Sequence, residues 1–190
     1  MFRSEAGEGD GALTKYFDKV AGEDSFKVRG VEVRQRSTPP FIESVQRELM
    51  EVLDEHREPA PVCDRLQVYL ARLRAGDVNP DELVFRKRAS KRIEEYSQGT
   101  HTLSALLRYR ANGIEKNPGQ DVRYVVVDDG ARLPNRVRLP FEKIEEYDAD
   151  VYTRELIRAA ESIVSPLGWE REDIRRYLRE TKDSTIQAYE

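Results

Sequence analysis

Two runs of basic residues are the parts of this sequence whose residue types and spacing best suit the binding of an anion. Residues 26–36 hold four cations against one acid, Glu32, and residues 85–92 hold five cations and no acid. The first run comprises Lys27, Arg29, Arg34 and Arg36, and the second comprises Arg86, Lys87, Arg88, Lys91 and Arg92. Guanidinium groups donate paired hydrogen bonds to phosphate oxygens. Both runs are therefore candidate phosphate contacts, with scattered, solvated charge as the alternative for each.

The overall charge points the other way. The 190 residues carry a formal net charge of −4, which argues mildly against nucleic-acid binding. The acids are concentrated elsewhere, in residues 5–10, 50–58, 127–130 and 142–150. A domain of this composition can bind a polyanion on a basic face while its acidic remainder repels it.

The sequence contains no pattern typical of a complete active site. It has one cysteine, Cys63, and two histidines, which excludes a disulfide framework and a cysteine-based or histidine-rich metal centre. Glycine-rich phosphate loops and common hydrolase motifs are absent. Cys63 lies near an apolar helix face and is expected to be a buried, inert thiol. His101 has no obvious acidic partner, so it is expected to be structural or to face nucleic acid. We predict no catalytic residue, no metal ligand and no cofactor bound by this chain.

The apolar pattern predicts the elements that position these residues. Residues 14–20 and 25–33 suit a β-hairpin, and two helices follow, one from Pro39-Pro40 and one between Pro59 and Ala75-Gly76. Their short connection predicts an antiparallel helix pair. No apolar stretch reaches the length of a membrane span and no signal core is present, which indicates a soluble, cytoplasmic protein without membrane contact.

The second half of the sequence alternates between strand and helix signals. Residues 83–85 suit a short strand, 102–111 a helix ended by Asn112-Gly113, and 122–127 a strand buried on both faces that residues 136–139 could join. A helix capped by Asp150 or its neighbours runs to Val164, and residues 171–179 form a final helix. The predicted fold class is mixed α+β: an N-terminal β-hairpin, an antiparallel helix pair, and a small mixed sheet with helices.

Several short motifs occur together in an order that resembles one family. They are Thr14-Lys15-Tyr16, residues 27–32, residues 82–85 with Tyr96 to Thr102, Asn117-Pro118-Gly119-Gln120, Tyr147 to Asp150, and Leu167-Gly168-Trp169. From about residue 13 to residue 189 the chain resembles the C-terminal part of archaeal and bacterial family B DNA polymerases, from the end of the palm through the thumb. The resemblance implies a palm-end hairpin segment over residues 1–36 and a thumb domain over 37–190.

The resemblance also implies which residues contact primer–template duplex DNA. Near the primer terminus these are Lys15, Tyr16, Lys27, Arg29, Gly30, Arg34 and Arg36. Further along the duplex they are Arg86, Lys87, Arg88, Tyr96, Gln98, Gly99 and Thr100. Thr14 departs from the family, in which many members have a basic residue at that place, and this would weaken one contact.

The catalytic carboxylates of the family lie in palm motifs that this sequence does not contain. The expected function is therefore that of a duplex-gripping thumb subunit of a split polymerase. It would contribute to DNA-directed DNA synthesis only with a large subunit that carries the palm, the fingers and the exonuclease, and whose palm would bind Mg²⁺. A fragment of a longer enzyme is an alternative. Another is a non-catalytic adaptor or assembly protein of a replication complex, derived from an inactivated polymerase.

Overall fold

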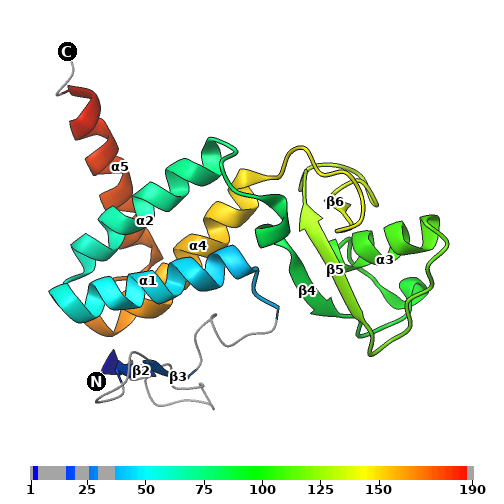
Figure 1. Cartoon of the computed structure of the whole chain (residues 1–190), viewed down its shortest axis with the longest axis horizontal. Coiled ribbons are helices and arrows are strands. Elements are labelled where there is room, and N and C mark those ends of the chain that lie inside the picture. The colour runs from blue at the N-terminus through cyan, green and yellow to red at the C-terminus, as the bar shows by residue number, and fades with distance from the viewer. Residues whose placement is uncertain (1, 4–15, 20–25, 30–36, 188–190) are drawn as a thin grey trace. The chain divides into compact units, whose positions relative to one another are not determined.

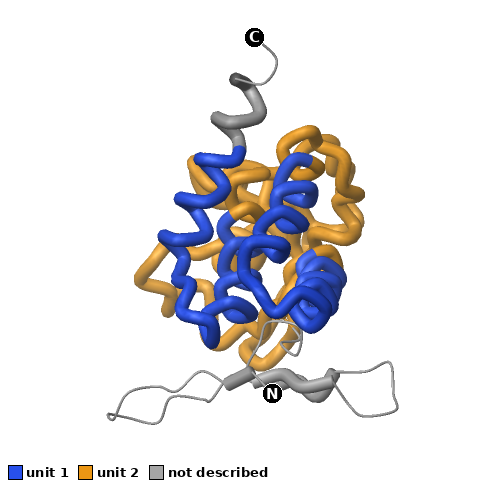
Figure 2. The backbone as a smooth tube through the Cα atoms, turned by 90° about the vertical axis from the view of Figure 1, so that its left-hand side faces the viewer, with its two compact units in different colours: residues 1–35, 42–71, 154–190 blue, residues 36–41, 72–153 orange. Residues whose placement is uncertain are grey.

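The computed structural model describes residues 2–3, 16–19, 26–29 and 37–187, with side chains from 37 to 181. This part of the chain contains five α-helices and a three-stranded antiparallel sheet, so the mixed α+β class is confirmed (Figure 1). The chain divides into two compact units, coloured separately in Figure 2. Unit 1 comprises residues 1–35, 42–71 and 154–190, and unit 2 comprises residues 36–41 and 72–153.

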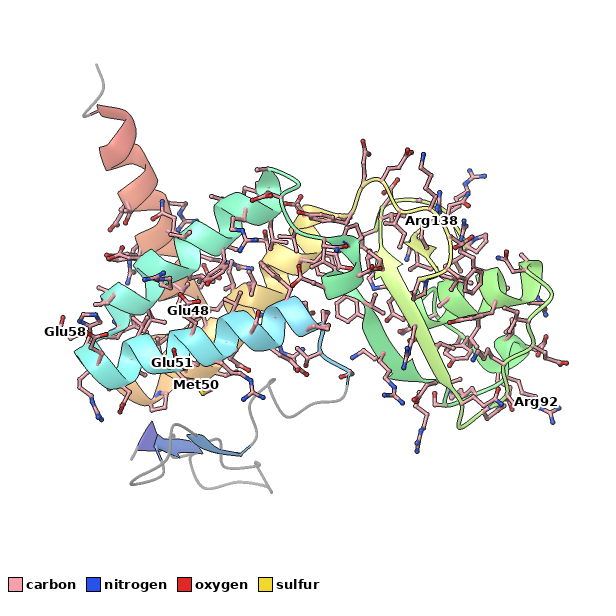
Figure 3. All side chains as sticks on the ribbon, in the orientation of Figure 1. Glu48, Met50, Glu51, Glu58, Arg92 and Arg138 are labelled. Carbon is pink, nitrogen blue, oxygen red and sulfur yellow. The ribbon has the colours of Figure 1, made fainter. Side chains whose placement is uncertain are left out.

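From residue 42 onwards, unit 1 is helical and is built from parts of α1 (Pro40–His56), α2 (Pro59–Arg74) and α4 (Ala149–Val164) together with α5 (Arg171–Gln187). Its core side chains recur at helical spacing, as the sequence predicts. They include Leu49, Leu53, Val62, Leu66 and Ile163, all fully buried. Glu48 of α1 faces α2, where it accepts a hydrogen bond from Tyr69 and pairs with Arg65 (Figure 3). The predicted antiparallel pairing of the first two helices is thus confirmed.

Polar contacts tie the other helices of unit 1 to this pair. The buried Gln46 Nε2 donates to the Ala159 carbonyl at 3.1 Å, which joins α1 to α4. Tyr177 Oη of α5 donates to Asp64 Oδ1 of α2 at 2.9 Å. Cys63 is fully buried, as the sequence predicts, and burial raises the pKa of its thiol to about 12.

Unit 2 contains the sheet, in the order β4 (Phe85–Arg88), β5 (Asp121–Val126) and β6 (Val137–Arg138), with neighbouring strands antiparallel. Helix α3 (His101–Ala111) packs against β5 and β6 (Figure 1). The predicted burial of the central strand on both faces is confirmed only towards its end, because Val125 and Val126 are fully buried whereas Arg123 is exposed. The Tyr152 hydroxyl accepts from Val126 N and donates to the Leu83 carbonyl, both at 2.9 Å. Phe85 lies 5.5 Å from the Tyr152 ring and 5.7 Å from Tyr124, measured between centroids.

The first strand of this sheet lies further along the chain than the sequence predicts. A strand over 83–85 is wrong, because Pro80–Leu83 forms the 3₁₀ helix η2 and the strand then begins at Phe85. Asn79 accounts for the shift, since its side chain accepts from Asp81 N at 3.0 Å and caps η2. Two further 3₁₀ turns, η3 (Ile93–Glu95) and η4 (Ser165–Leu167), precede α3 and follow α4.

Asp148 is the residue that caps α4. Its Oδ1 accepts from the backbone N–H groups of Asp150 and Val151, both at 3.1 Å, and its Oδ2 accepts from Asp129 N at 2.8 Å. One carboxylate therefore fixes both the start of α4 and the turn that follows β5. The predicted cap at Asp150 or a neighbour is accordingly refined to Asp148.

Three short strands, β1 (Phe2–Arg3), β2 (Tyr16–Lys19) and β3 (Phe26–Arg29), are described in the N-terminal part. The residues that connect them lie outside the described part of the chain, so the predicted hairpin stays a prediction. The predicted boundary at residue 36 also falls outside it. Within the described residues, no helix is both long and apolar enough to cross a bilayer.

Candidate nucleic-acid interface

An exposed cationic face is formed where β4 pairs with β5. Arg86 lies directly opposite Arg123, and Arg88 directly opposite Asp121. Because side chains two residues apart in a strand share a face, these four side chains lie on the same side of the sheet. Arg86, Arg88 and Arg123 are exposed and Asp121 is half-buried. We call these four residues the cationic face.

Asp121 neutralises only one of the three guanidinium groups. Arg86 Nε donates to Asp121 Oδ2 at 2.7 Å. This hydrogen bond is the main reason why the pKa of Asp121 lies below its usual range, and the nearby charges of Arg88 and Arg123 add to the effect. Three arginines against one aspartate leave a net charge of +2 on the cationic face.

The remaining cations of this run lie on β4 or in the loop that follows it. Arg86, Lys87, Arg88, Asp121 and Ser37 line an open groove of about 340 Å³. Lys87 is half-buried, on the same side of β4 as Phe85, with its Nζ 6.0 Å from the centroid of that ring. Lys91 and Arg92 follow in an exposed loop, and the Arg92 side chain points away from the ribbon (Figure 3). The structure therefore groups Arg86, Lys87 and Arg88 at β4, whereas Arg92 lines a separate pocket with Glu94 and Arg110.

The predicted DNA-contacting loop lies on the other side of β5. The Gly99 carbonyl accepts a hydrogen bond from Arg136, the residue before the edge strand β6. The basic run lies on and after β4, which is the other edge strand of the sheet. Thr100 caps α3, because its Oγ1 accepts from Leu103 N at 3.2 Å. Gln98 is exposed. The ring of Tyr96 is half-buried, and its buried hydroxyl has no hydrogen-bond partner among the described residues.

His101 has an acidic partner that the sequence did not indicate, so the expectation of none is wrong. Its Nε2 lies 2.7 Å from Asp129 Oδ1. Asp129 is 28 positions away in the chain, and the turn after β5 brings it to the start of α3. Asp129 N is itself bonded to the Asp148 cap of α4. His101 thus has a structural role in linking α3 to this turn.

The N-terminal contacts that the sequence predicts cannot be placed in the same way. Lys15, Gly30, Arg34 and Arg36 lie outside the described residues. Tyr16, Lys27 and Arg29 are described as strand backbone only. Their role in binding duplex DNA stays a prediction.

Sequence reasoning missed two arginines of unit 2, one on the cationic face and one bonded to the loop that contains Gly99. Arg123 completes the cationic face, and the alternation of polar and buried residues from Asp121 to Tyr124 was the signal that could have found it. Arg136 holds the loop that contains Gly99, and only the tertiary structure reveals that contact. Among the described residues, no group of three or more His, Cys, Asp or Glu side chains could hold a metal ion.

Comparison with known proteins shows which proteins this α+β domain is similar to. No family model matches the chain. It is 24% identical over 166 residues to a DNA polymerase of Thermococcus gorgonarius, covering 85% of this chain and 21% of that protein. It is 23% identical over 180 residues to a DNA polymerase of Desulfurococcus sp. strain Tok, covering 92% and 23%.

The fold agrees with these sequence matches. The structure of the family B DNA polymerase from Pyrobaculum calidifontis matches 73% of this chain and 18% of that chain, with a TM-score of 0.59 at 20% identity. The chain is therefore a distant homologue of family B DNA polymerases over most of its length. It spans about a fifth of the length of these relatives and is related to one domain of them.

Proposed function

We propose that this chain is a thumb that grips duplex DNA behind the active site of a family B polymerase, as the small subunit of a split enzyme. The observation that carries the proposal is the cationic face. Like charges placed directly opposite each other on paired strands destabilise a sheet. Arg86 and Arg123 are such a pair, and Arg88 adds a third cation beside them. A polyanion that binds this face would relieve the repulsion.

The geometry of the face suits phosphates rather than bases. Arg86 and Arg88 are two residues apart on one strand, so their Cα atoms are about 7 Å apart. Neighbouring phosphates of one strand differ by an axial rise of about 3.4 Å and by the rotation between base steps, so side chains at this spacing can reach neighbouring phosphates. Guanidinium groups bind phosphate oxygens through paired hydrogen bonds. Contacts of this kind fix the position of the duplex without reading its sequence, as a processive polymerase requires.

The N-terminal part of the chain would add contacts near the primer terminus. The residues proposed for these contacts are Lys15, Tyr16, Lys27, Arg29, Gly30, Arg34 and Arg36. The reaction itself needs carboxylates that hold two metal ions. The described residues of this chain provide no such group, so the proposal assigns the metal site to a large subunit with palm, fingers and exonuclease domains.

Binding of a primer–template duplex across a range of salt concentrations tests the grip. The double variant Arg88→Ala/Arg123→Ala removes the two cations of this face that pair with no acid among the described residues, so the slope of log affinity against log salt should decrease in magnitude by about 1.8. A matched control is Arg47→Ala/Arg179→Ala, which removes two exposed arginines from helices of unit 1 to which the proposal assigns no contact. If both double variants lose the same slope, the binding is diffuse and the cationic face has no special role.

A separate experiment tests the partnership. Proteins captured from native extract by the tagged chain should include a large polypeptide with palm and exonuclease motifs. Primer extension by that polypeptide should become more processive when this chain is added. If the chain binds no duplex and leaves extension unchanged, it acts as an adaptor rather than as a thumb.

A further inference from the structure

Arg136 joins two loops of unit 2 through its side chain. Its Nε donates to the Ala131 carbonyl at 2.7 Å, within its own turn. Its Nη1 donates to the Gly99 carbonyl at 2.8 Å, 37 positions away in the chain. The first bond holds the guanidinium in the turn that leads into β6, and the second attaches the loop of residues 97–100 to it. Among the described residues, Arg136 makes no ion pair with an acid.

The loop at the other end of this bond packs closely against the same turn. A Cβ built on Gly99 would lie 3.5 Å from Leu133 Cδ1, which is van der Waals contact. Thr100 N donates to the Gln98 carbonyl at 3.0 Å, and Thr100 Oγ1 then caps α3. A displacement of Gly99 would therefore move Gln98 on one side and the helix cap on the other.

We propose that Arg136 is a positioning residue, which holds the loop of residues 97–100 in the conformation that contacts duplex DNA. This inference rests on the proposed function and on the duplex contact predicted for Gln98, Gly99 and Thr100, and adds to them a residue that need not touch DNA. The planar guanidinium has a rigid fork of donors, so it can reach two carbonyls in fixed directions. A lysine at this position keeps the charge but lacks the fork, and cannot reproduce both bonds in the same geometry.

Two variants separate positioning from direct phosphate contact. Arg136→Lys keeps the positive charge and removes the fork. Arg132→Lys is the matched control, because Arg132 is exposed in the same turn and its side chain bonds to none of the described residues. A residue that only supplies charge to a phosphate would tolerate the change to lysine at either position. A positioning residue would tolerate it only at position 132.

The first measurement is amide hydrogen exchange in the full chain without DNA. In Arg136→Lys, the amides of Thr100 and Leu103 should exchange about tenfold faster, the change expected when one net hydrogen bond is lost. In Arg132→Lys they should exchange at the parent rate. Unchanged exchange in Arg136→Lys would overturn the inference whether or not the chain binds DNA.

The second measurement is affinity for a primer–template duplex at fixed salt, with thermal melting to check that each variant is folded. Arg136→Lys should bind several-fold more weakly than the parent although its charge is the same, and Arg132→Lys should bind like the parent. Faster exchange with parental affinity would show that the loop takes no part in binding, which also overturns the inference. A parent chain that binds no duplex would instead refute the proposed function, and the positioning role with it.

Discussion

Removing the one acid of the cationic face should strengthen duplex binding while it weakens the fold. In the parent, Asp121 accepts the Arg86 hydrogen bond and offsets part of the repulsion between Arg86 and Arg123. Asp121→Asn keeps the size of the side chain and removes its charge. Arg86 then becomes available to a phosphate, and the repulsion across the two strands is no longer offset.

The size of the effect follows from the charge count on the face. The parent presents two unpaired guanidinium groups, and the variant presents three. One added phosphate contact increases the magnitude of the salt slope by about 0.9. At 0.1 M salt this corresponds to about eightfold tighter binding. Thermal stability should change in the opposite direction, because an ion pair is lost and like charges remain opposed.

The assay is a fluorescence titration of a labelled primer–template duplex at four or more salt concentrations, with melting curves for each protein. Glu94→Gln is the matched control. It makes the same change of charge and also releases an exposed arginine, Arg110, from an ion pair with an N–O distance of 3.1 Å. The control should bind with the parental slope. If Asp121→Asn binds with the parental slope or more weakly, Arg86 does not face the duplex and the proposed interface is wrong.

Three further predictions concern the fold that carries the interface. Tyr152→Phe removes a buried hydroxyl that bonds to two backbone groups, and it should lower the free energy of unfolding by about 1–3 kcal/mol in urea titrations. An unchanged free energy of unfolding would contradict the packing of β5. The thiol of Cys63 should resist alkylation at pH 8 until the chain is denatured, because burial raises its pKa to about 12; labelling of the native chain would contradict this. Burial acts to raise the pKa of Glu142, but hydrogen bonds from Arg108 and a backbone amide hold it below its usual value. The ionised carboxylate therefore stabilises the fold above about pH 4.3, and this contribution is lost as the pH falls through the lowered pKa. Glu142→Gln should accordingly be less stable than the parent at pH 6 and approach the parent's stability towards pH 3. An equal loss of stability at both pH values would contradict the assignment.

Regular apolar spacing is what made the helices predictable. The apolar residues of α1, α2 and α4 recur every three to four positions, and the buried run of β5 stands out as a strand. The edge strand β4 was placed too early in the chain, because it contains one apolar residue, Phe85, followed by three cations. Lys87 stands on the same side of β4 as Phe85, where an alternating strand would have its next apolar residue, so the apolar pattern does not reveal the strand.

The contacts that build the site were less predictable, because they join residues distant in the chain. The basic run was visible as a cluster of charge, but the sequence does not show that Asp121 pairs with Arg86 from 35 positions away. The same holds for His101 with Asp129 and for Arg136 with Gly99. Each pair depends on the register of β5 or on the turn that follows it, and both are set by tertiary packing.

Site-specific cross-linking to DNA tests the central claim most directly. Because Cys63 is fully buried, Ser90→Cys gives the described part of the chain one accessible thiol for a photo-cross-linker, in the exposed loop just after β4. Val68→Cys on α2 provides an exposed control in unit 1. If the cationic face grips the duplex, position 90 should cross-link to the double-stranded part of a primer–template at low salt, and the yield should fall as salt rises. Equal yields from positions 90 and 68, or no cross-link from position 90, would contradict the claim.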